Sequence, residues 1–184
     1  PIAETASIFC ETIILQASIK EADSKTKIVL LESYLMGATQ TIVDIYSRYL
    51  FETEVFKRRN AGSIPVSVLN ELMIKAQIKA YGDGLDHDIL HPYMWICKPH
   101  YYSADYNFYN FPYAFGHLFS LGLYSQYLSN KKEFVAKFDT LLKLTGKANL
   151  VDVAQSVNID IEDLSFWRSS LELLAKDIQS FIKL

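Results

Sequence analysis

The stretch SKTKIVLLESYLMGATQTIVDIYSRYLFETEVFKRR, residues 24–59, repeats apolar side chains with the period of an α-helix. Steps of three or four residues link many of its apolar positions, including Ile28, Leu31, Leu35, Ala38, Ile42, Ile45, Tyr49 and Phe56. Such spacing lines one face of a helix, whereas a half-buried strand would alternate apolar and polar residues. Ser24 is a residue type that favours the N-cap. The stretch therefore predicts one long amphipathic helix from about Ser24 to about Arg59.

The rest of the chain is also helical in pattern, and no stretch alternates convincingly over strand length. Residues 86–103 are expected to be irregular, because Pro92 and Pro99 prevent a continuous helix. The sequence predicts an all-α protein, a multi-helix bundle. Its further helices are expected over residues 2–21, from near Pro65 to the YGDG turn, from Ser103 or Ala104 to about Leu128, and over residues 131–144, 149–156 and 160–183.

The composition is that of a globular domain. The chain has 184 residues, of which 50% are hydrophobic, enough to bury a sizeable core. It contains no Ser/Gly-rich linker, low-complexity tract or run of like charges that would mark a boundary. We therefore expect a single all-helical domain over residues 1–184.

The charge pattern argues against a nucleic-acid partner. The net charge is -3, and lysine and arginine are scattered rather than grouped in a stripe. A base-stacking platform has cations beside its aromatic rings, but no Lys or Arg lies between Lys98 and Lys131, where tyrosines are densest. No nucleic-acid role is expected.

The expected location is the cytoplasm. Cys10 and Cys97 make neither a disulfide framework nor a zinc-finger spacing, which fits a reducing compartment. The first residues carry acids where a signal peptide has basic residues, and no apolar run reaches the roughly 18 residues of a membrane span. The chain starts with Pro1, directly in a helical pattern, so we expect it to be a piece of a longer protein.

Two acids lie on a first helix that is otherwise apolar nearly all round. Glu4, Ser7 and Glu11 stand at i, i+3 and i+7, so they share one strip of that helix. The helix is expected to be buried, and a buried carboxylate needs a cation, a metal or hydrogen bonds to stay charged. The strip is either a metal-ligand or acid–base site or an exposed edge, and spacing alone leaves both open.

The four histidines differ in context. His87 and His91 stand four apart in LDHDILHPY, like two zinc ligands on a helix, but the preceding YGDG turn and Pro92 leave space for barely two helical turns. A surface or capping role is therefore favoured for both. His117, within the apolar YAFGHLFSLGLY, is typical of a hydrogen-bonded core histidine. His100 opens the tyrosine-rich segment, where a loop-borne imidazole can reach a cleft.

The segment HYYSADYNFYNFPY, residues 100–113, contains five tyrosines. On a helix, Tyr106, Tyr109 and Tyr113 would share one face. Aromatic core packing is one explanation, with each hydroxyl finding a partner. The other is a polar pocket in which these phenols and His100 donate hydrogen bonds to a developing oxyanion, which explains the use of tyrosine where phenylalanine would pack as well.

Four blocks of the sequence, in this order, resemble the C-terminal portion of the oligoendopeptidase F enzymes, in the thimet oligopeptidase-like family of zinc metallopeptidases. The resemblance covers essentially the whole chain and implies the C-terminal part of a zincin-type catalytic domain. The blocks are IAETASIFCE at 2–11, PHYYSADYNFYNFPYAFGHLFSLGLY at 99–124, FDTLLKLTG at 138–146 and DIEDLSFWRSSLELL at 160–174.

The resemblance implies roles for the acids of the first helix. In this family, two histidines of an HExxH helix and a glutamate in an E-x-x-S pattern on a following helix hold the zinc. The letters ETAS at 4–7 match that pattern, so Glu4 is the expected third zinc ligand. Ser7 and Glu11 would stand behind it, with Glu11 orienting a zinc-binding histidine.

The resemblance also implies roles in the tyrosine segment. Family enzymes place a histidine and tyrosines opposite the zinc, where they bind the substrate backbone and stabilise the tetrahedral intermediate. His100, Tyr106 and Tyr113 match these catalytic residues by position. Tyr109 lies in the same neighbourhood as an expected substrate-binding residue, and Asn110 stands where some relatives have another tyrosine.

One departure from the family is large, because no HExxH occurs in this sequence. HDILH at 87–91 follows the expected third ligand instead of preceding it. The resemblance thus implies a missing N-terminal half that carries two zinc ligands and the general base. One zinc ion is the expected cofactor of the full-length enzyme, short peptides and the missing half are the expected partners, and the chain alone should bind zinc poorly and be inactive.

Two other functions remain open from the residues. A self-contained helical module would bind a peptide on the tyrosine face without metal. A stand-alone metal enzyme would instead use His87, His91 and Glu4, and would need stoichiometric zinc in the isolated chain.

Overall fold

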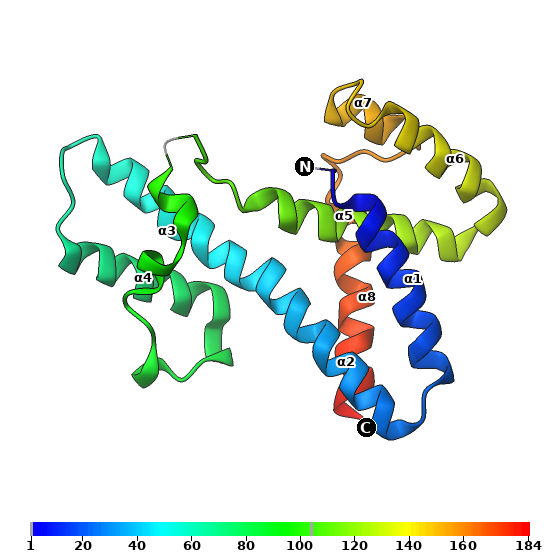
Figure 1. Cartoon of the computed structure of the whole chain (residues 1–184), viewed down its shortest axis with the longest axis horizontal. Coiled ribbons are helices and arrows are strands. Elements are labelled where there is room, and N and C mark those ends of the chain that lie inside the picture. Colours follow the sequence, from blue (N-terminus) through cyan, green and yellow to red (C-terminus); the bar gives the residue numbers. More distant parts are fainter. Residues whose placement is uncertain (1, 104) are drawn as a thin grey trace. The chain divides into compact units, whose positions relative to one another are not determined.

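The computed structural model describes residues 2–103 and 105–184, and these contain helices but no strand (Figure 1). The all-α prediction is confirmed. The chain forms two compact units, Pro1–Gly37 with Phe115–Leu184 and, between them in sequence, Ala38–Ala114. The single domain expected over residues 1–184 stays a prediction.

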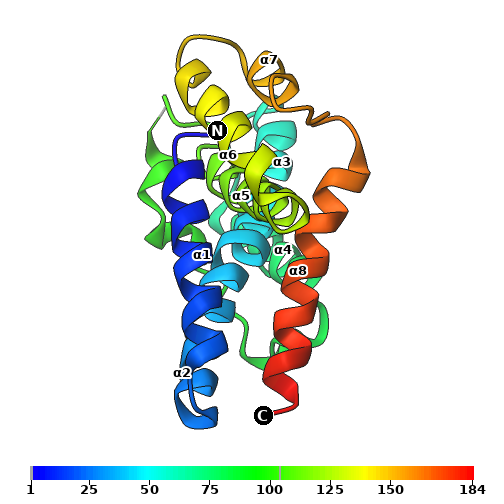
Figure 2. The same ribbon diagram turned by 90° about the vertical axis from the view of Figure 1, so that its right-hand side faces the viewer.

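The first unit is built from helices at both ends of the sequence. Figures 1 and 2 show α1 and α2 as a hairpin that turns at Ala22 and Asp23. The elements that contribute to this unit are α1 (Thr5–Glu21), α2 (Ser24–Thr39), α5 (Phe111–Ser129), α6 (Lys131–Leu144), α7 (Leu150–Gln155) and α8 (Leu164–Ile182).

An aromatic core holds the first unit together. The Phe9 ring of α1 stacks on Phe134 of α6 with 5.1 Å between centroids, and Phe119 of α5 is fully buried. Large rings at such contacts dominate the apolar area that leaves water. The core comprises Phe9, Phe119, Leu123, Tyr124, Phe134, Leu141, Val153, Ala154, Val157 and Ile159.

A buried serine fixes the start of α1. The Ser120 hydroxyl of α5 lies 2.9 Å from the Thr5 carbonyl oxygen and 2.7 Å from that of Gly116, so it donates toward both. Ser120 and Thr5 are almost completely buried. The first turn of α1, beside Glu4, is therefore tied to α5 within this unit.

The second unit consists of two packed helices and a series of short turns. Figure 1 shows α3 (Ile45–Arg59) and α4 (Val66–Tyr81) joined by a loop, and Phe51, Leu72, Met73 and Ala76 form the core between them. A π-helical turn, η1 (Gln40–Asp44), precedes α3. Four 3-10 turns follow α4: η2 (Gly82–Gly84), η3 (His87–Ile89), η4 (Met94–Cys97) and η5 (Pro99–Tyr102).

The long helix predicted over residues 24–59 is confirmed, with one irregularity. Helical structure runs from Ser24 to Arg59, but five residues in its middle adopt the wider π-helical winding of η1. The N-terminal cap lies one residue earlier than expected, because the Asp23 carboxylate accepts the Thr26 N–H at 2.8 Å. The irregular turns expected over residues 86–103 are also present.

The start predicted for the aromatic helix is wrong. The helix α5 begins at Phe111, and Tyr106 and Tyr109 lie in turns before it; the expected start at Ser103 or Ala104 falls partly outside the described residues. Phe108 has a φ of 53°, in the left-handed region that a right-handed helix excludes. Pro112 lies in the first turn of α5, where its missing N–H costs nothing.

Three smaller predictions also need correction. α1 starts at Thr5, three residues later than expected, and α8 starts at Leu164 because the Asp163 carboxylate caps the Ser165 N–H at 2.8 Å. Within the first unit, α1 is not buried all round, and Ile14 is 67% exposed. One face of the helix enters the core through Phe9, so the apolar residues of the other face stay at the surface.

The helix Ser24–Arg59 is long and apolar enough to cross a membrane by length and composition alone, with a mean hydropathy of 1.3 over its best window. The expectation that no stretch reaches span length is therefore too strict. This criterion is weak evidence for a span, because the core helix of a soluble protein also meets it.

Candidate functional site

The second unit brings together the histidine and tyrosines singled out from the sequence. The His100 ring, in η5, stacks on Tyr109 with 5.0 Å between centroids and 15° between planes. Tyr109 also contacts Tyr106 at 4.7 Å and Tyr113 at 6.1 Å. The tyrosines are 39–48% exposed. They form a partly exposed aromatic surface rather than a dry core, although only Tyr113 of the three lies on a helix.

A buried carboxylate holds the turn that carries these rings. The Glu52 Oε1 atom accepts the Phe108 N–H at 3.0 Å, and the Phe108 ring packs on Phe56 and Tyr49 with centroid distances of 5.3 and 5.6 Å. Burial raises the pKa of the Glu52 carboxyl, and the bond from Phe108 partly opposes this rise. Glu52 therefore stabilises a backbone conformation that phenylalanine rarely adopts.

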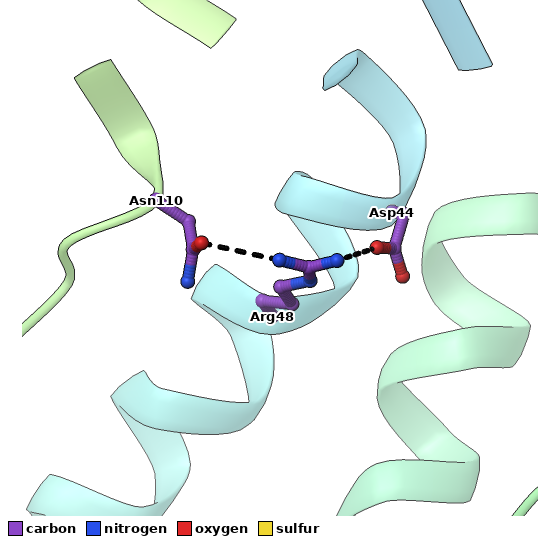
Figure 3. A network of polar contacts seen from close by, with 3 residues as sticks. All are labelled: Asp44, Arg48 and Asn110. Atoms are coloured by element: carbon purple, nitrogen blue, oxygen red, sulfur yellow. Dashed lines mark hydrogen bonds and ion pairs between the residues drawn. The ribbon is translucent and has the colours of Figure 1, made fainter. Parts of the chain in front are cut away.

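A second anchor lies one helical turn away on the same helix. Figure 3 shows Arg48 between two partners: it donates through Nη1 to the Asn110 amide oxygen at 3.1 Å and through Nη2 to the Asp44 carboxylate. All three side chains are buried, and Asn110 is only 3% exposed. Tyr81 also hydrogen-bonds Asp44, and burial together with this carboxylate raises the pKa of Tyr81 to about 12.

His100 and Tyr113, together with Arg48 and Asn110, border a surface pocket with mostly polar lining residues, here called the Arg48 pocket. It has a volume of about 380 Å³, within the range of small-ligand sites. It is lined by Gln40, Thr41, Ile45, Arg48, His100, Asn110 and Tyr113. A second pocket of about 190 Å³ also borders on His100 and is lined in addition by Glu52, Tyr101 and Asn107, among others. Burial and the nearby Glu52 raise the pKa of Tyr101.

The acids of α1 belong to the first unit and lie at its surface. Glu4 is the N-cap residue of α1, and its side chain makes no capping hydrogen bond. The Ser7 hydroxyl donates to the Glu4 carbonyl oxygen at 2.9 Å. Glu4, Ser7 and Glu11 are all exposed, so their side chains are accessible; exposure does not decide between an edge of the helix and a metal-ligand strip.

The described residues do not form a metal centre by themselves. Nowhere in residues 2–103 and 105–184 do three His, Cys, Asp or Glu side chains come close enough to hold an ion. A structural or catalytic zinc ion needs at least three protein ligands. Glu4 offers one accessible carboxylate, which suits one ligand of a site completed by other residues.

The other histidines have structural environments. The His87 ring bonds the Gly82 carbonyl oxygen at 2.9 Å, and the His91 ring accepts the Tyr93 N–H at 3.2 Å. Both cap local turns, as the sequence indicates. His117 is buried as expected and stacks on Tyr34, but the hydrogen bond expected for it is missing at Nε2, which has no partner among the described residues. Burial lowers the pKa of His117.

Sequence reasoning missed the three buried charges that position the site. Asp44, Arg48 and Glu52 follow one another at four-residue steps in the long helix, on the side that faces α4 and the tyrosine turns. The signal that could have found them is this spacing, since charges that share one face of an apolar helix need partners. No residue near them in sequence identifies Asn110 or Phe108 as those partners.

Comparisons with known proteins find relatives among oligopeptidases. "Oligoendopeptidase F, plasmid" of Lactococcus lactis subsp. cremoris is 27% identical over 185 residues, which cover 100% of this chain and 30% of that protein. "Oligopeptidase PepF" of Bacillus subtilis is 25% identical over 162 residues, covering 87% of this chain and 24% of the relative. The "Oligoendopeptidase F homolog" of Borreliella burgdorferi is 26% identical over 163 residues, with 86% and 27% covered.

The chain thus spans no more than about 30% of the length of these curated relatives. No family model matches the chain, and no solved structure matches it.

Proposed function

We propose that this chain, which is similar over its whole length to oligoendopeptidase F enzymes, is the C-terminal portion of a zinc-dependent metalloendopeptidase that hydrolyses short peptides in the cytoplasm. The observation that carries the proposal is the cluster of His100, Tyr106, Tyr109 and Tyr113 beside a polar pocket. Their positions are those that the family resemblance assigns to substrate binding and catalysis.

The proposed work of the second unit is hydrogen-bond donation. The phenol of Tyr113, with His100 and Tyr106, donates to the peptide backbone and to the oxyanion that forms when the scissile carbonyl is attacked. Tyr109 stacks on His100 and also contacts Tyr106 and Tyr113, so it fits a role in positioning the substrate. Because Glu52 and Arg48 hold the turn before α5, these donors are oriented before substrate arrives.

The proposed work of the first unit is to supply one metal ligand. Glu4 gives one carboxylate, and Ser7 and Glu11 stand behind it on the same strip. The other ligands and the general base would come from an N-terminal part of the same protein, its partner in this proposal. A zinc ion in such a site lowers the pKa of bound water and polarises a carbonyl group.

Metal analysis combined with a peptide-cleavage assay on the full-length protein tests this proposal. The wild-type protein should contain about one zinc per chain and cleave short peptides, whereas Glu4→Gln should lose both, since an amide is a poor replacement for an anionic ligand. Glu21→Gln, at the exposed C-terminal end of α1, is the matched control and should keep both. A Glu4→Gln protein that retains its zinc would contradict the ligand role.

The same assay distinguishes the zinc peptidase from the alternative function, a helical module that binds peptides without metal. The exposed tyrosine cluster and the lack of a complete metal site among the described residues are the observations that favour it. Such a module would bind peptides, release them uncleaved and be indifferent to Glu4→Gln. Cleavage that disappears with a chelator would exclude it.

A further inference from the structure

We propose that the Arg48 pocket is a subsite that binds a carboxylate group of the peptide substrate. This inference rests on the proposed peptidase function and adds a chemical preference to it. The pocket borders on His100 and Tyr113, so a carboxylate bound there would belong to the same peptide that these residues contact.

Three buried nitrogen atoms of the pocket residues have no hydrogen-bond partner among the described residues: Arg48 Nε, Asn110 Nδ2 and His100 Nδ1. The orientation of the Asn110 amide is fixed, because its oxygen accepts from Arg48 Nη1 and arginine has only donors. Its nitrogen is therefore left as a donor. Buried donors without acceptors are unfavourable, so a ligand that supplies acceptor oxygens gains binding free energy by meeting them.

The number of donors favours a carboxylate over a peptide carbonyl. Arg48 Nε carries one hydrogen, Asn110 Nδ2 carries two, and His100 Nδ1 carries one in the tautomer protonated there. A carbonyl oxygen accepts two hydrogen bonds, whereas the two oxygens of a carboxylate accept about four. Bonds from a guanidinium to a carboxylate are also charge-assisted.

The electrostatic setting of the pocket agrees with this choice. None of its described lining residues is an acid. Asp44 pairs with Arg48 through Nη2, which holds the guanidinium in place while Nε has no partner in the described parts of the chain.

A peptide offers a carboxylate from two sources, its C-terminus or an acidic side chain. Three peptides of otherwise identical sequence distinguish them: one with a free C-terminus and no acid, one amidated with no acid, and one amidated with a single glutamate. Dissociation constants and kcat/KM on the full-length protein give the preference. A preference for the first peptide assigns the C-terminus, and a preference for the third assigns a side chain.

Asn110→Asp is the test variant. Aspartate keeps an oxygen for Arg48, so the anchor is retained, but it replaces the donor nitrogen with a second, anionic acceptor. The preference for the carboxylate peptide over the amidated one is the ratio of their dissociation constants or of their kcat/KM values. Each ratio should fall roughly 10- to 100-fold. Asn107→Asp adds the same charge to the same segment, at the smaller pocket, and should leave the preference unchanged.

The result that overturns the inference is a wild-type protein with no preference, or an Asn110→Asp protein with the wild-type preference. If Asn110→Asp does not fold, Gln40→Glu places a carboxylate at the same pocket and should reduce the preference in the same way. Binding that prefers the carboxylate peptide without any cleavage would support the subsite and refute the peptidase function.

Discussion

Glu52 accepts the backbone N–H of Phe108, 56 residues further along the chain, and Phe108 is one of two non-glycine residues with positive φ in the described parts of the chain. The hydrogen bond and the unusual backbone conformation occur at the same residue. Together they set the direction in which the chain leaves Tyr106 and enters the turn of Tyr109. The position of the tyrosine cluster thus depends on a carboxylate that does not belong to it.

Removing the Glu52 acceptor should loosen this turn. Glu52→Ala leaves the Phe108 N–H unpaired and should lower the free energy of unfolding by about 1–3 kcal/mol, as well as the rate of peptide cleavage. Glu52→Gln keeps an acceptor oxygen and removes a buried charge, so it should retain most of the stability and the activity. Urea unfolding curves measure the first effect. Equal stability of the two variants would show that the acceptor does not hold the turn.

The buried pair of Asp44 and Arg48 should be sensitive to the loss of one partner. Arg48→Met leaves the Asp44 carboxylate inside the protein without its cation, although Tyr81 still hydrogen-bonds it, and should cost about 3 kcal/mol or more. Adding Asp44→Leu should restore much of this loss, because the double variant has no buried charge at this position. A double-mutant cycle from unfolding curves measures the coupling.

An exposed ion pair with the same spacing is the control for that cycle. Lys75 and Glu71 stand four residues apart on α4, with side chains that are 64% and 60% exposed. Lys75→Met should therefore leave the stability almost unchanged. A similar loss at both pairs would mean that burial does not distinguish them.

The sequence predicted the helices well where periodicity is long and uninterrupted. The helix Ser24–Arg59 and the helix Lys131–Leu144 are found at their predicted bounds, because amphipathic spacing over several turns has one structural solution. The prediction of a helix failed at residues 105–110, where aromatic residues at helical spacing also suit turns. The left-handed Phe108 depends on Glu52, a distant residue that local patterns do not contain.

The candidate site, too, was predicted only in part from the sequence. His100, Tyr106, Tyr109 and Tyr113 were correctly expected to lie close together, although the common helical face given as the reason does not exist. The Arg48–Asn110 contact joins α3 to a turn 62 residues later and was not foreseen. Whether these residues and Glu4 act on a peptide stays a prediction.

The close packing of α5 on α8 should make Gly122 intolerant of substitution. A Cβ atom there would overlap the Phe166 ring, so the ring or the helix would have to move. Gly122→Ala should cost roughly 1–3 kcal/mol from overpacking. Gly37→Ala, in α2, meets no atom within 4 Å and should instead stabilise the chain by about 0.5–1 kcal/mol. Thermal unfolding of both variants checks the contrast, and equal effects would contradict it.

Asp177 should make stability depend on pH. Burial raises the pKa of this carboxyl above its usual value of 3.8, although the hydrogen bond from Gln16 partly opposes the rise. The folded chain then binds the proton more tightly than the unfolded chain, so stability falls as pH rises from about 3.8 through the raised pKa. Asp177→Asn removes this loss and should be more stabilising at pH 7 than at pH 3.

The control for this effect is Asp139→Asn, which removes a carboxylate from the exposed face of α6. Unfolding free energies of the three proteins across this pH range should show a flatter profile for Asp177→Asn alone. Parallel profiles for Asp177→Asn and the wild-type protein would mean that the burial of Asp177 does not influence folding.

The most direct test of the account is the turnover number of Tyr113→Phe in the full-length protein. If the Tyr113 phenol donates to the oxyanion, its loss should raise the barrier by about 3 kcal/mol and lower kcat roughly 100-fold, with unfolding stability and zinc content unchanged. Tyr102→Phe, at an exposed tyrosine of the same segment, should keep the wild-type kcat. An unchanged kcat in Tyr113→Phe would contradict the role of this cluster in peptide hydrolysis.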